Sequence, residues 1–255
     1  MRVLDLFSGI GGFSLGLQMA GGFETVQFVE IDPWCRQVLA KNFPGVPVHD
    51  DIKTFGGVPA DVVCGGFPCQ PFSHAGKQRG TADDRDLWPE MARVIETVRP
   101  AWVIGENVAG FIPMGLDRSI SDLESLGYEV QAFDLPACAV QAPHRRSRVW
   151  IIGHSHRHDE PELPVDAEVS RQPTLAHSIS QRGCSGHPAG ENAEDAGESP
   201  RGQELRQWLP EPSVGRVAHG IPRRVDRLRG LGNAVVPQVV AEIGRAIMSS
   251  RSARQ

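Results

Sequence analysis

Short β-type runs alternate with helix-type segments through the first 153 residues, and this alternation limits the folds open to the chain. The β-type runs lie at 3–7, 25–31, 60–65, 102–105, 128–135 and 148–153. Helix-type segments lie between them, at 14–20, 33–42, 87–98 and 119–126. Strands and helices in this order predict an α/β, doubly wound, mostly parallel sheet.

The composition changes abruptly after Gly153. Between residues 154 and 219, Leu, Ile, Val and Phe together number 9 of 66, below the roughly 20% typical of segments that build a core. Residues 235–248 then resume an amphipathic helical pattern. We therefore predict a main domain at 1–153, a small and partly flexible lobe at 154–229, and a C-terminal segment at 230–255 that returns to the main domain.

Composition excludes several classes of protein. No apolar run approaches the roughly 20 residues that cross a bilayer, so we expect a soluble cytoplasmic chain without a membrane or targeting segment. Five cysteines without a CxxC pair argue against a disulfide framework and a thiolate zinc site. The histidines of the 154–158 segment alternate with polar residues, which favours a solvated loop, and we predict no metal site.

A glycine-rich turn follows the first β-type run, in the segment Asp5-Leu6-Phe7-Ser8-Gly9-Ile10-Gly11-Gly12. Glu30 ends the next run, where a carboxylate commonly accepts hydrogen bonds from a ribose diol. The pair indicates a cofactor that contains adenosine. NAD, FAD and S-adenosylmethionine sites share this geometry, and some such turns serve only helix packing, so this motif leaves the cofactor open.

Cys69 lies in the segment Gly66-Phe67-Pro68-Cys69-Gln70-Pro71, directly after a buried β-type run. Two prolines stiffen this loop, which suits a thiol that must meet one atom of a substrate. We therefore predict that Cys69 is a nucleophile, and that the other four cysteines are structural.

Glu106 and a group of arginines are the remaining candidates for chemistry. Glu106 follows the 102–105 run and can act as a general acid if burial raises its pKa; the alternative is a capping or ion-paired glutamate. An extended segment at 144–148 is predicted to place His144, Arg146 and Arg148 on one face. Arginines there can hold a phosphate or a base carbonyl, or they can form a solvated face.

Taken in this order, these segments and the final Gly232-Asn233-Ala234-Val235-Val236-Pro237-Gln238 resemble the cytosine-C5 DNA methyltransferase family, especially its shorter phage or prophage-like members. The resemblance implies a Rossmann-like S-adenosylmethionine-dependent fold with a small inserted target-recognition lobe. It implies four catalytic residues, Cys69, Glu106, Arg146 and Arg148. The cofactor-binding residues that it implies are Phe7, Ser8, Gly9, Ile10, Gly11, Gly12, Glu30, Ile31, Asp32, Asp51, Ile52, Gly66, Pro68, Leu87, Asn233, Ala234 and Val235. His144 departs from the glutamine that is common in the family.

The same resemblance implies a mechanism and its partners. Cys69 adds to C6 of a flipped-out cytosine, Glu106 protonates N3, Arg148 holds O2, and S-adenosylmethionine methylates C5 and leaves as S-adenosylhomocysteine. The expected partner is double-stranded DNA, with a cognate restriction endonuclease as a further candidate, no membrane, and a monomeric enzyme. Two alternatives stay open: a tRNA cytosine-C5 methyltransferase, and a non-catalytic relative that binds DNA or cofactor.

Overall fold

The computed structural model describes residues 1–68, 86–155 and 224–252. The predicted nucleophile Cys69 and most of the predicted lobe, 156–223, lie outside the described residues. No helix in the three described ranges is long and apolar enough to cross a membrane.

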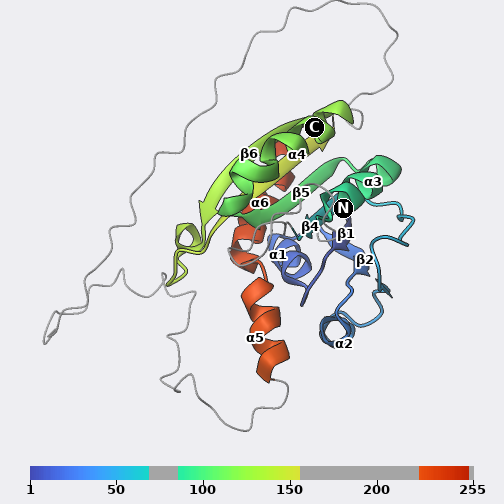
Figure 1. The fold of residues 1–255 in the computed structure, drawn as a ribbon, viewed down its shortest axis with the longest axis vertical. Helices are drawn as coiled ribbons and strands as arrows, with labels where there is room; N and C mark the ends of the chain where they lie inside the picture. Colours follow the sequence, from blue (N-terminus) through green and yellow to red (C-terminus); the bar gives the residue numbers. More distant parts are fainter. Residues whose placement is uncertain (69–85, 156–223, 253–255) are drawn as a thin grey trace, which may run out of the picture.

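Seven strands form one sheet in the order β3-β2-β1-β4-β5-β7-β6 (Figure 1). They are β1 (Arg2–Leu6), β2 (Glu24–Val29), β3 (Val48–His49), β4 (Val62–Gly66), β5 (Trp102–Val108), β6 (Tyr128–Pro136) and β7 (Ser147–Ser155). The pairs from β3 to β5 are parallel, whereas β7 runs antiparallel to both of its neighbours. The predicted doubly wound, mostly parallel sheet is confirmed.

The helices are α1 (Gly12–Ala20), α2 (Pro33–Asn42), α3 (Trp88–Val98), α4 (Asp117–Ser125), α5 (Arg224–Asn233) and α6 (Pro237–Ser252). Shorter helical turns lie at Ala109–Phe111, Ile112–Leu116 and Ala137–Val140. Alternate strand residues point to opposite faces of the sheet and belong to two separate apolar clusters, as expected for a pleated sheet that is covered on both faces. One cluster joins Leu4, Leu6, Val63 and Val103 to residues of α3 and α4. The other joins Val3, Val62, Cys64 and Ile104 to residues of α1 and α6.

Helix α6 packs directly on α1, and a glycine makes the close contact feasible (Figure 1). A Cβ at Gly16 would lie 2.5 Å from Cβ of Val240 and would also contact the Pro237 carbonyl oxygen. Helix α6 therefore packs tightly against α1.

We expect Gly16→Ala to destabilise the fold, because a methyl group at this position must force α1 and α6 apart. Overpacking of this kind costs about 1–3 kcal/mol, which urea unfolding of the purified protein measures. Gly56→Ala is the matched control, since a Cβ there meets nothing within 4 Å. Equal unfolding midpoints for both variants would contradict this account of the contact.

Three local predictions are wrong or incomplete. Glu106 was placed just after a strand, but β5 runs on to Val108 and includes it. The segment 144–146 was expected in an extended strand, yet β7 begins only at Ser147, because the left-handed backbone of Gln141 and Arg146 interrupts the extended run. Helix α5 was not predicted, and it crosses the expected boundary at residue 230.

Candidate functional site

The candidate residues gather at one edge of the sheet. The carboxyl ends of the parallel strands β1, β2, β4 and β5 meet there, and ligands of open α/β sheets bind at such an edge. Strand β7 runs the other way, so its first residues reach the same edge, with Arg148 opposite Val108. Segments far apart in the sequence are thereby brought to a common site.

The turn after β1 has the backbone of a ligand-binding loop. Gly9 and Gly11 adopt left-handed φ angles of 54° and 88°, and a Cβ at Gly9 would meet nothing within 4 Å. Phe7 also has a positive φ, 52°, which is unusual for a residue with a side chain. The Glu30 carboxylate accepts hydrogen bonds from Gly9 N at 2.7 Å and from Asp32 N at 2.8 Å. The structure therefore brings Glu30 against the glycine turn.

Asp5 of β1 binds the start of helix α1, directly after the same turn. Its Oδ2 accepts hydrogen bonds from the backbone nitrogen and the hydroxyl of Ser14, in the first turn of α1, where the N-cap Gly11 offers no side chain. Burial raises the pKa of Asp5 to about 7, and the hydrogen bonds from Ser14 oppose the rise. The prediction of site residues missed this role. The sequence signal for it is an aspartate between Leu4 and Leu6 in a short apolar run.

Further predicted cofactor residues follow β2 and β3 in the chain. Asp32 caps α2 and lies 3.6 Å from Arg229 of α5, while Ile31 is 71% exposed at the rim. Ile52 is buried, and its carbonyl accepts a hydrogen bond from Arg93. The nearby Asp51 is half-buried. Their roles in binding stay predictions.

Glu106 and Arg148 form a partly enclosed ion pair. Nε of Arg148 lies 2.9 Å from Oε1 of Glu106, and the two residues are diagonal neighbours on the same face of β5 and β7. Glu106 is only 8% exposed. Burial raises its pKa to about 7, against the opposing charges of Arg148 and Arg146. This carboxyl is therefore poised to carry a proton near neutral pH.

The chain that leads to Cys69 begins beside this carboxyl. Gly66 pairs with Glu106 across the sheet, and a Cβ there would lie 3.1 Å from Oε2 of Glu106. Asn107 donates a hydrogen bond to the Phe67 carbonyl at 3.0 Å. Leu87, which follows the residues outside the described ranges, donates its backbone N–H to the Pro68 carbonyl at 3.3 Å. The described residues on either side of 69–85 are thus tied together next to the site, and Asn107 is a contributor that the sequence prediction omitted.

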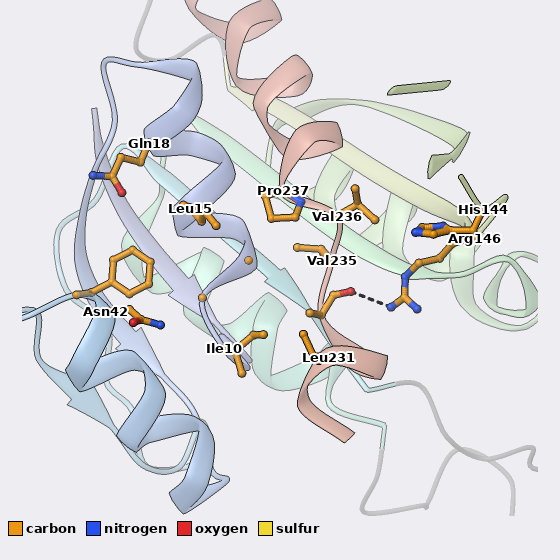
Figure 2. Close-up of a pocket in the computed structure, with 14 residues that line it drawn as sticks. Ile10, Leu15, Gln18, Asn42, His144, Arg146, Leu231, Val235, Val236 and Pro237 are labelled. Carbon is orange, nitrogen blue, oxygen red and sulfur yellow. Dashed lines mark hydrogen bonds between the residues drawn. The ribbon is translucent and has the colours of Figure 1, made fainter. Parts of the chain in front are cut away.

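Arg146 makes a different set of contacts from Arg148. Its Nη2 donates to the Gly232 carbonyl at 2.7 Å and to the Ala234 carbonyl at 2.8 Å, and Figure 2 draws the second of these bonds. Burial and the neighbouring Arg148 lower its pKa from the ordinary value. Arg146 and His144 therefore do not share a strand face with Arg148, contrary to prediction, although both line one pocket.

That pocket, of about 480 Å³, lies between α1, the end of α2 and the 231–237 segment (Figure 2). Five of its lining residues were predicted to bind cofactor: Ile10, Gly11, Gly12, Ala234 and Val235. Glu30 and Asp51 do not line it. The structure thus joins the glycine turn to the C-terminal segment, while Glu30 contacts the Gly9 backbone from outside this pocket.

Comparison with known proteins agrees with this geometry. A family model described as "C-5 cytosine-specific DNA methylase" matches residues 1–192. The type II methyltransferase M2.BsuMI of Bacillus subtilis is 37% identical over 64% of this chain and 47% of its own length. M.NgoFVII of Neisseria gonorrhoeae is 34% identical over 70% of this chain and 52% of its own length. The chain therefore spans about half the length of the curated relatives that it matches.

Solved structures have the same fold. A protein described as a DNA modification methyltransferase encoded within an E. coli prophage is 28% identical, with a TM-score of 0.54 over 65% of this chain and 49% of that one. The Dnmt2 methyltransferase of S. pombe is 25% identical, with a TM-score of 0.52 over 61% of this chain and 51% of that one. These likenesses confirm the methyltransferase fold expected from the sequence.

Proposed function

The chain belongs to the C-5 cytosine-specific DNA methylase family, and we propose from this that it is a DNA (cytosine-5-)-methyltransferase. The observation that carries the proposal is the buried carboxyl of Glu106. It is paired with Arg148 and lies beside the chain that leads to Cys69, at the edge where the glycine turn also lies.

The residues of the strand edge fit S-adenosylmethionine as cofactor. The left-handed turn at Gly9 exposes backbone to open space, and Glu30 beside it offers carboxylate oxygens to a ribose. The N-terminus of α1 and the 233–235 segment would hold the amino acid end. When bound, S-adenosylmethionine supplies an activated methyl group.

Cytosine C5 is a poor nucleophile until C6 carries a new bond. The Cys69 thiolate forms that bond, and electrons move through the ring toward N3. Glu106 donates its proton to N3 while Arg148 stabilises the charge that develops at O2. C5 can then accept a methyl group, N3 returns its proton to Glu106, and loss of the C5 proton to a base expels Cys69 as the leaving thiolate.

The substrate cytosine must leave the base stack to meet these groups, which costs a few kcal/mol in duplex DNA. We propose double-stranded DNA as the substrate and the cytoplasm as the place of action. A restriction endonuclease of matching specificity is the proposed functional partner, because the curated relatives are type II methyltransferases.

Bisulfite sequencing of DNA from cells that express the protein tests the proposal. We expect protected cytosines within a single short sequence context, and none in cells that express Cys69→Ala. In parallel, purified protein with tritiated S-adenosylmethionine should label DNA. Label in tRNA with unprotected DNA would contradict the proposed substrate, and cofactor binding without label in either nucleic acid would contradict catalysis.

A further inference from the structure

Arg146 caps the end of helix α5. The last carbonyls of a helix have no partner within it, and the negative end of the helix dipole attracts a cation. Helix α5 ends at Asn233, and Nη2 of Arg146 donates to the carbonyls of Gly232 and Ala234, on either side of that end. One guanidinium nitrogen thus satisfies two acceptors.

The segment after α5 depends on an outside donor. Only Ala234, Val235 and Val236 separate α5 from α6, which begins at Pro237. Val239 and Val240 of α6 donate to the Val236 carbonyl, whereas the Ala234 carbonyl receives its hydrogen bond from Arg146. Figure 2 shows this segment between the glycine turn and Arg146.

The other side of the segment rests on the glycine turn. A Cβ at Gly12 would lie 2.8 Å from Cγ2 and 3.2 Å from the carbonyl oxygen of Val235. The missing side chain at Gly12 therefore lets the Val235 backbone come close. Residues 234 and 235 are held between Gly12 on one side and Arg146 on the other.

The backbone of Arg146 is adapted to this contact. Its φ angle is 30°, in the left-handed region that residues with a side chain usually avoid. Surrounding contacts must over-determine such a conformation for it to persist. The bend precedes β7, so Arg146 turns to the C-terminal segment while Arg148 stays in the strand beside Glu106.

We infer that Arg146 is a positioning residue, which sets the affinity for S-adenosylmethionine by holding residues 232–235 against the glycine turn. This inference rests on the proposed function and replaces the catalytic role predicted for Arg146. The two arginines then have different roles. Arg148 faces the reacting base, and Arg146 acts on the cofactor through the C-terminal segment.

Titration calorimetry with S-adenosylhomocysteine tests the inference on the full chain. We expect Arg146→Gln to weaken binding about tenfold or more, and Arg146→Lys to recover part of the loss, since an ammonium group can also donate to both carbonyls. Arg145→Gln is the control. It removes the same charge from the exposed neighbouring residue, and it should leave the affinity unchanged.

Two further measurements separate positioning from catalysis. In Arg146→Gln, KM for S-adenosylmethionine should rise while kcat at saturating cofactor and KM for DNA stay within a few-fold of wild type. Amide hydrogen exchange in 231–236 should accelerate in the same variant without cofactor, and exchange in β4 and β5 should not. The exchange comparison also applies to Arg146→Lys if the glutamine variant folds poorly.

A fall in kcat with unchanged S-adenosylhomocysteine affinity would overturn the inference and return Arg146 to the catalytic group. Equal weakening by Arg145→Gln would also overturn it, because general electrostatics would then explain the effect. Failure of the wild type to bind S-adenosylhomocysteine would instead overturn the proposed function, and the inference with it.

Discussion

Cys69→Ala is expected to lower methyl transfer by about 10³-fold or more, because without the thiolate nothing activates C5 of cytosine. Binding of S-adenosylhomocysteine should stay within a few-fold of wild type, since the predicted cofactor contacts are made by other residues. Single-turnover transfer of tritiated methyl to DNA measures the loss, and calorimetry measures the binding.

Cys64→Ala is the matched control for this prediction. Cys64 lies five residues earlier, fully buried in β4 between the two sheet neighbours β1 and β5, where its thiol is shielded from any substrate. Methyl transfer should survive this substitution. Similar losses of activity in both variants would show that the effect is structural and would remove the case for Cys69 as nucleophile.

Glu106→Gln is expected to lower methyl transfer by about 10²- to 10⁴-fold, the usual contribution of a general acid. Glutamine fills the same space and can still bond to Arg148, but it has no acidic proton for N3. Cofactor affinity should be nearly unchanged. A matching loss of affinity for S-adenosylhomocysteine would identify Glu106 as a structural residue instead.

The pH dependence of the wild type gives a second test of Glu106. Burial raises the pKa of this carboxyl to about 7. A general acid works only while protonated, whereas the Cys69 thiolate that the reaction also needs becomes more populated as the pH rises. The ratio of the wild-type single-turnover rate to that of Glu106→Gln removes the thiolate contribution, and this ratio should fall as the pH rises through about 7. A ratio that is flat between pH 6 and 8.5 would contradict this assignment.

The sequence predicted the sheet because β1, β4, β5 and β7 are mostly buried on both faces and carry distinct apolar runs. It also predicted α2 to the residue, from Pro33 to Asn42, because a proline is well suited to the first turn of a helix. Strand β3 was missed since two residues, Val48 and His49, carry no periodicity. Such a strand exists only because β2 offers it partners.

The site was less predictable where tertiary contacts override local pattern. Gly230 and Gly232 argue against a helix at α5, yet Gly230 packs closely on Trp34, and Arg146 caps the helix end. Alternation placed Arg146 beside Arg148, and the positive φ of Arg146 breaks that alternation. The contact of Gly230 with Trp34 and the contact of Arg146 with the end of α5 each join segments more than 80 residues apart, so no short stretch of sequence predicts either of them.

Trapping with 5-fluorocytosine is the most direct measurement of the central claim, that Cys69 bonds covalently to the cytosine it helps to methylate. Release of the product requires the C5 substituent to leave as a cation, which hydrogen can do and fluorine cannot. DNA that carries 5-fluorocytosine in many sequence contexts, incubated with S-adenosylmethionine, should therefore form a protein–DNA adduct that survives denaturation. The adduct should be absent in Cys69→Ala and present in Cys64→Ala. A wild-type protein that methylates ordinary DNA but forms no adduct with any fluorinated context would contradict the account.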